Sequence, residues 1–251
     1  MLKQIFAGLG LFTLLFLSIS PVLANPDIYT KQYTHADAVT VLGITVSPAQ
    51  NTYEEIWVSG DKMRMDSYDD KAKLISSIIW RGDKTKMYDI NHASRTYGEL
   101  DLSTNLGGVV PMMEMTVEVT PTSESKKIKN WDCRKYVMKI KAGIAGITST
   151  SIYEIWASED VHIDYGRYME LNQSAASGLF SFTEAIAKEL EEVKGYPVLS
   201  ETTITTTGSS IKITTELLEY DSHKSTPKGF YDVPLGFTKV EVSPAPPRKE
   251  L

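Results

Sequence analysis

The sequence predicts a mainly β protein in which an antiparallel sheet is covered by one amphipathic helix. Residues 53–141 consist of short β-branched and apolar runs separated by Gly, Asn, Asp and Ser turns, which is typical of an antiparallel meander. One helical pattern, at residues 181–194, interrupts the strands, and the strand pattern returns at Val198. The chain is 42% hydrophobic and 23% charged, so it has the composition of a globular domain rather than of a disordered chain or a coiled coil.

The N-terminus has the pattern of a secretory signal peptide. Lys3 is the only charged residue before Asp27, and the apolar run 5–19 is followed by Pro21 and a small residue, Ala24. A transmembrane anchor is the alternative, but a span needs roughly 20 apolar residues and this run is shorter. We therefore predict a signal peptide at residues 1–24, cleavage near Ala24, and a periplasmic or secreted product whose mature chain has no transmembrane anchor.

Strands are expected throughout the first half of the mature chain. Alternating apolar and polar residues, or short β-branched runs, mark each of them, and turns such as Ser59–Lys62 divide them. The expected strands fall within 54–66, 74–80, 87–90, 96–100, 115–120 and 136–141.

One strand motif occurs twice. Residues 55–61 and 154–160 match at five of seven positions, and each copy holds an Ile-Trp pair whose side chains point to opposite faces of a strand. We interpret this as one strand type reused within a single domain at residues 25–242, followed by a flexible Pro-rich tail at 243–251.

The helical segment begins with a capping box, in which Ser181 and Glu184 satisfy each other's backbone amides. Apolar residues recur at spacings of three and four, and Gly195 and Pro197 end the pattern. Beyond it, residues 202–217 read as a β-branched hairpin that turns at Gly208.

Charge and cysteine content exclude several classes. A net charge of -6 argues against nucleic-acid binding, and a single Cys excludes an intramolecular disulfide framework or a Cys-rich zinc module. Cys133 precedes Arg134 and Lys135, which lower a thiol pKa where they are close to it. No His lies in a recognisable nucleophile motif, so we interpret Cys133 as a buried structural residue and keep a reactive thiol as the alternative.

Several motifs resemble an uncharacterised family of exported bacterial β-rich domains. These are the two Glu-Ile-Trp strands, the Trp131-x-Cys133 strand entry, and the run from Pro227 to Gly236. The architecture also resembles, more distantly, the LolA-like periplasmic lipoprotein carriers. That resemblance implies a curved antiparallel sheet or incomplete β-barrel whose concave side is covered by the helix, and a cavity for acyl chains or another apolar ligand.

Methionine and tryptophan are the candidate ligand contacts, because flexible Met side chains suit apolar ligands of varied shape. Ordinary core packing is the alternative for these residues. The candidate binding residues are Trp57, Met63, Met65, Met87, Met115, Met138, Trp156, Phe182 and Ile186.

The sequence contains no phosphate loop, metal-ligand cluster or catalytic elbow, so we predict no catalytic residue, metal or cofactor. The expected function is non-catalytic binding of an apolar or lipid-like ligand, such as an acyl chain, in the bacterial envelope, by a lipid or lipoprotein carrier or sensor. The alternatives are a structural or protein-interaction module with a fully packed core, whose protein partner the sequence does not name, and a hydrolase or thiol enzyme that uses Cys133.

Overall fold

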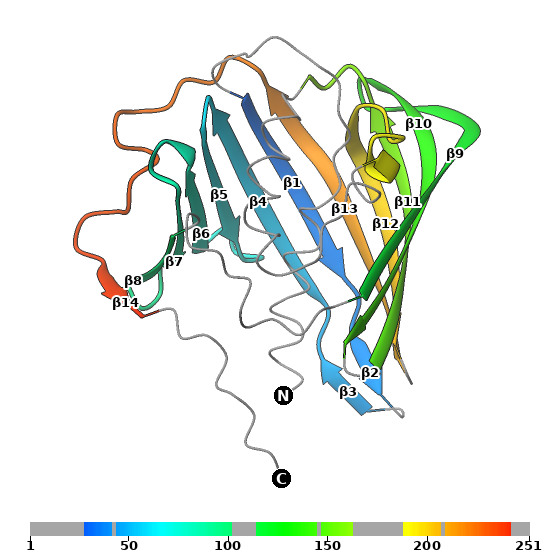
Figure 1. Cartoon of the computed structure of the whole chain (residues 1–251), viewed down its shortest axis with the longest axis horizontal. Helices are drawn as coiled ribbons and strands as arrows, with labels where there is room; N and C mark the ends of the chain where they lie inside the picture. Colours follow the sequence, from blue (N-terminus) through cyan, green and yellow to red (C-terminus); the bar gives the residue numbers. More distant parts are fainter. Residues whose placement is uncertain are drawn as a thin grey trace.

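The computed structural model describes residues 28–41, 44–101, 114–144, 147–162, 188–206 and 209–241. Almost all regular structure in these ranges is strand (Figure 1). The strands are β1 Ile28–Ala36, β2 Val39–Val41, β3 Ile44–Ser47, β4 Gln50–Ser59, β5 Lys62–Tyr68, β6 Leu74–Arg81, β7 Lys86–Asn91, β8 Thr96–Asp101, β9 Glu114–Ile128, β10 Trp131–Ile144, β11 Ile147–Ser158, β12 Tyr196–Thr206, β13 Ser209–Asp221 and β14 Thr238–Val240.

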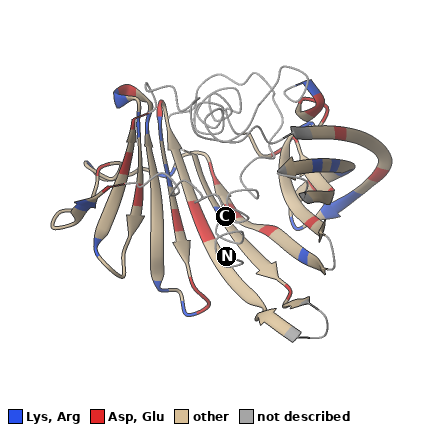
Figure 2. Ribbon diagram, turned by 60° about the horizontal axis from the view of Figure 1, so that its bottom comes forward, with Lys and Arg blue, Asp and Glu red and all other residues tan. Residues whose placement is uncertain are grey.

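Twelve of these strands form one sheet in the order β14-β8-β7-β6-β5-β4-β1-β13-β12-β11-β10-β9, and β2 and β3 form a separate hairpin. Every neighbouring pair in the large sheet is antiparallel except β14 and β8. The sheet bends into a trough, and its edge strands β9 and β14 do not pair with each other in the described part of the chain (Figure 2). The predicted curved antiparallel sheet is therefore confirmed, and it is not a closed barrel.

The first half of the predicted covering helix, residues 181–187, lies outside the described residues, so the cover itself is not shown. The described end of that segment has a helical turn at 188–190. Leu190 and Val193 are buried in the main core, and the Glu189 carboxylate accepts a hydrogen bond from the backbone N–H of Val119 at 3.0 Å. This end of the segment is thus fixed against edge strand β9.

Strand alternation divides the sheet into two faces. On β4, Ile56 and Val58 point to the face that carries the main core, which we call the inner face, while Trp57 points to the outer face. The pairing of Ile56 with Met65 and Val58 with Met63 continues the apolar row onto β5. The second Glu-Ile-Trp motif lies on β11 in the same sheet, and its Ile155 is buried on the inner face.

The main core occupies one end of the inner face, and we call it the packed end. It brings together strands from both halves of the sheet, because Met63 and Met65 of β5 belong to the same cluster as Met138 of β10 and Val198 of β12. Its members include Met63, Met65, Trp80, Tyr136, Met138, Tyr153, Ile155, Tyr196, Val198 and Leu217.

The outer face carries a smaller aromatic cluster, to which Phe230, Tyr231 and Phe237 of the C-terminal segment 222–240 belong. Figure 1 shows the course of this segment along the sheet. Tyr231 is buried against Ile79 and Ile90, and Phe230 packs edge-on against Trp57 with ring centroids 5.0 Å apart. Arg64 donates from Nη1 to the Phe230 carbonyl at 2.8 Å and stacks on the Phe230 ring. The segment ends in β14, which adds a parallel strand to β8.

Candidate ligand-binding site

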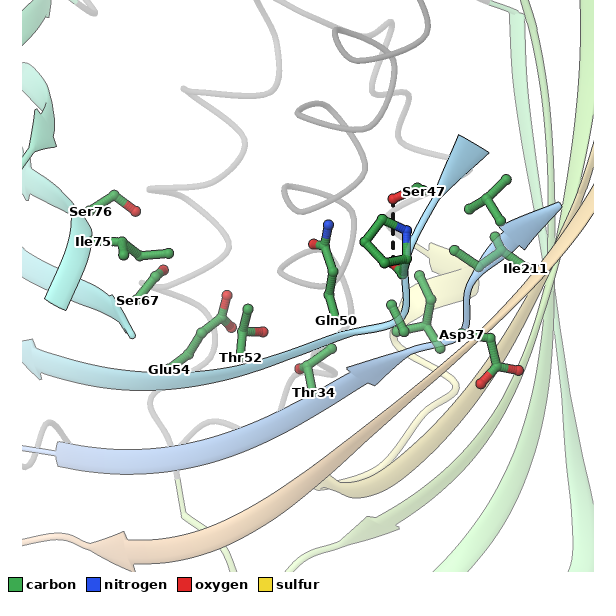
Figure 3. Close-up of a pocket in the computed structure, with 14 residues that line it drawn as sticks. Thr34, Asp37, Ser47, Gln50, Thr52, Glu54, Ser67, Ile75, Ser76 and Ile211 are labelled. Carbon is green, nitrogen blue, oxygen red and sulfur yellow. Dashed lines mark hydrogen bonds between the residues drawn. The ribbon is translucent and has the colours of Figure 1, made fainter. Parts of the chain in front are cut away.

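A cavity of about 280 Å³ lies at the other end of the inner face, which we call the open end (Figure 3). Strands β1, β4, β5, β6 and β13 and the β2–β3 hairpin contribute its walls. The lining residues are Thr34, Ala36, Asp37, Val39, Ser47, Pro48, Gln50, Thr52, Glu54, Ser67, Ile75, Ser76, Ile211 and Ile213.

The cavity begins where the inner-face residues change from large and apolar to small and polar. Along β4 the inner positions run from Val58 and Ile56 to Glu54 and Thr52, and β5 runs from Met65 to Ser67. Register aligns these changes, because Glu54 pairs with Ser67 on one side and with Gln32 of β1 on the other. Short Ser and Thr side chains cannot fill the trough that Met and Trp fill elsewhere, so space remains.

Glu54 is the charged group inside this cavity. It is half-buried, and in Figure 3 its side chain is directed to the same side of the strands as Thr34 and Thr52. Among the described residues, no hydrogen bond or ion pair reaches its carboxyl group. Burial raises the pKa of Glu54 from 4.5 to about 7, because removing water disfavours the charged form.

The other titratable groups near the cavity have partners of their own. Asp37, at the rim, accepts from His35 Nε2 at 3.2 Å, and its side chain is 54% exposed. Tyr196 of β12 is buried and its hydroxyl accepts a hydrogen bond from the Gln32 side chain. Burial raises the pKa of Tyr196 to about 12, so this hydroxyl stays neutral at ordinary pH.

The residues predicted to bind ligand lie elsewhere. Met63, Met65 and Met138 are 4%, 5% and 0% exposed at the packed end, and Met87 packs against them. Trp57 lies on the outer face with Tyr29 and Phe230 and so does not share a wall with the methionines.

The remaining predicted binding residues are also not among the described residues of the cavity wall. Trp156 is half-buried, with the Lys126 and Lys135 ammonium groups 3.9 and 5.7 Å from its ring centroid. Met115 belongs to β9, but its side chain lies outside the described residues, as do Phe182 and Ile186. None of the nine predicted residues is among the described residues that line the cavity, and their role in binding stays a prediction.

Two nucleophilic side chains, those of Ser77 and Cys133, are buried in this structure. Ser77 is 1% exposed, and its hydroxyl donates to Asp66 at 2.5 Å and contacts His92 Nε2 at 2.8 Å. Asp66 also accepts from Arg64 Nε at 2.8 Å, and we interpret this group as a structural network.

Cys133 is 2% exposed, as the sequence predicted, and burial raises the pKa of its thiol to about 11. Nowhere in the described ranges do three or more metal-ligating side chains gather.

The geometry defines an open antiparallel half-barrel with an amphipathic cavity in its trough. The chain belongs to the family described as Domain of unknown function (DUF4412), which matches residues 41–237. No curated protein sequence matches the chain significantly. In the part of the chain that the structure describes, no helix is long and apolar enough to cross a membrane.

Solved structures show distant similarity to this chain. An uncharacterized conserved protein from Thermus thermophilus has a TM-score of 0.40 at 6% identity, over 84% of this chain and 90% of that one. A putative outer membrane lipoprotein-sorting protein domain from Vibrio parahaemolyticus has a TM-score of 0.30 at 8% identity, over 83% of this chain and 90% of that one.

Proposed function

We propose that this protein is exported and binds a small apolar or lipid-like ligand, without catalysis, in the cavity at the open end of its sheet. The observation that carries this proposal is the cavity of about 280 Å³ at the open end, beside the packed core that shares the trough with it. Export rests on the signal peptide predicted at residues 1–24.

The lining suits a ligand with an apolar body and a polar end. Ile75, Ile211 and Ile213 offer apolar contacts, and the hydroxyls of Ser and Thr residues offer hydrogen bonds. An alkyl chain that buries ~150 Å² of apolar surface gains on the order of 4 kcal/mol. The volume is at the lower limit of the ~300–1,000 Å³ that ligand pockets usually have, so one short chain fits and a two-chain lipid does not fit inside it.

The test is a substitution that fills the cavity, compared with the same substitution at an exposed position outside it. Thr52→Leu places a branched side chain in the cavity, whereas Thr203→Leu makes the same change at an exposed position of β12. We expect native mass spectrometry of the exported protein to show a bound small molecule, and the neutral dye Nile red to bind. Thr52→Leu should weaken Nile red binding by about tenfold, as expected when apolar contact is blocked, while Thr203→Leu should not.

A ligand-free protein that does not bind Nile red would remove this proposal. In that case the alternative function, a protein-interaction or structural module, is favoured by the packed end, where side chains from β4–β6 and β9–β12 fill the trough. A stable protein partner that co-purifies with the chain would then support it.

A further inference from the structure

The charged residues that line the cavity restrict which polar group a ligand can carry. Its described lining residues include two carboxylates, Asp37 and Glu54, and no Lys or Arg. Asp37 is largely exposed and contacts His35, so Glu54 is the carboxyl group that the described lining leaves without a partner.

The described residues that Glu54 faces on the neighbouring strands have polar, uncharged side chains, and none of them carries a positive charge. From β1 it faces Gln32 and Thr34, from β5 it faces Ser67, and Ser76 of β6 lies beyond Ser67. Among the described residues, the titratable groups near the cavity are Asp37 at the rim, its partner His35, and Tyr196 of β12, which interacts electrostatically with Glu54. A carboxylate removed from water and left unpaired is costly, whereas a cation brought by the ligand removes that cost.

We propose that the ligand of this cavity is a small amphiphile with a protonated amine at the end of an apolar body, and that Glu54 binds the amine. The apolar part then lies against Ile75, Ile211 and Ile213, and the Ser and Thr hydroxyls accept the remaining N–H groups. This proposal rests on the proposed function and specifies the chemical class of its ligand.

Glu54 also makes binding dependent on pH. Because burial raises the pKa of Glu54 to about 7, the empty site is partly protonated at neutral pH. An ammonium group pairs with the carboxylate form, so binding of an amine should release a proton and strengthen as the pH rises. A fatty-acid anion should bind weakly, because its carboxylate would lie near Glu54 and the described lining has no Lys or Arg to pair with it.

The experiment measures displacement of Nile red by three molecules with the same alkyl chain: octylamine, octanol and octanoate. Putrescine, a short diamine, serves as the control for charge without an apolar chain. At about pH 8 we expect octylamine to bind about tenfold or more tightly than octanoate, since a charged hydrogen bond contributes ~1.5–3 kcal/mol. Octylamine should bind several-fold more weakly at about pH 5.5, where Glu54 is protonated.

Glu54→Gln is the decisive variant, because it keeps the shape of the side chain and removes its charge. It should bring octylamine to within about twofold of octanol and remove the pH dependence. If octanoate displaces the dye as well as octylamine does, or if Glu54→Gln leaves the preference for the amine unchanged, this inference is wrong while the cavity remains a binding site. Putrescine that binds as tightly as octylamine would also overturn it, because the apolar body would then contribute nothing. If the protein binds neither Nile red nor any of the molecules, the proposed function itself fails.

Discussion

The packed end and the open end of the inner face share strands β4, β5 and β6. Large side chains form a core at the packed end, whereas the open end contains a cavity. On β5, Met63 and Met65 are buried in the core, whereas Ser67, two residues further along, lines the cavity. On β6, Trp80 is buried and Ser76 lines the cavity. The strands continue through both ends, so the volume of the inward side chain decides whether the trough is filled.

The comparison teaches that, on these strands, the large apolar residues form the packed core, whereas the cavity lies beside smaller inward side chains. Met138, which is 0% exposed, is surrounded by neighbouring side chains and offers no surface to a ligand. The space is left by small residues such as Thr34 and Ser67. The following predictions test whether the two ends differ in this way, from the largest expected effect to the smallest.

Met138→Ala should lower the free energy of unfolding by about 2–5 kcal/mol, because it leaves a void in a close-packed cluster. Thr52→Ala, on the wall of the cavity, should change it by less than about 1 kcal/mol, because that space is already empty. Urea denaturation measures both variants. Equal losses would show that the two ends are packed alike and would end the distinction between them.

Glu54→Gln should remove a pH dependence of stability that belongs to the open end. The folded-state pKa of Glu54, about 7, is above the unfolded value of 4.5, so the folded state holds this proton more tightly. The contribution of Glu54 to the free energy of unfolding therefore falls as the pH rises from 4.5 to 7 and is constant above that range. Because solvent reaches a half-buried carboxyl group, we expect a fall on the order of 1–2 kcal/mol.

Denaturation of the wild-type protein and of Glu54→Gln on the two sides of this pH range measures that contribution. The control is Glu192→Gln at an exposed position, which should retain the wild-type fall. A Glu54→Gln variant with the same pH dependence as the wild-type protein would show that Glu54 does not titrate in this range.

The rate of thiol labelling should differ between the packed end and the open end, and this measurement does not depend on a difference in stability. Cys133 belongs to the packed end, is 2% exposed and has a pKa raised to about 11, so a water-soluble maleimide should modify it at least about a hundredfold more slowly than it modifies the unfolded chain. In the Ser76→Cys variant the new thiol lines the cavity and should react quickly. Rapid labelling of Cys133 in the folded protein would reopen the hypothesis of a reactive thiol.

Much of the fold followed from local patterns in the sequence. Alternation along residues 54–66 predicted strands in a region that now contains β4 and β5, and the β-branched run around Gly208 predicted the antiparallel pairing of β12 and β13. The opposite faces predicted for Ile56 and Trp57 are also observed. These features depend on neighbours along one strand or across one turn, which a sequence displays directly.

The site could not be located in the same way, because it depends on register between distant segments. Glu54 becomes a cavity residue through its pairing with Gln32 and Ser67, and Ile213 reaches the same wall from the far end of the chain. Candidate residues chosen for their apolar character lead instead to the core, as Met65 and Met138 show. The one local signal was the change from apolar to small polar residues within β4 and β5.

The position of β1 has a consequence for biogenesis. This first strand lies between β4 and β13, and its Tyr29 pairs with Asp221, close to the end of the chain. In the described sheet the two halves are joined only through β1, so they cannot unite until β13 has been synthesised. Such long-range pairing folds slowly, because the chain must close a long loop before β1 and β13 can pair.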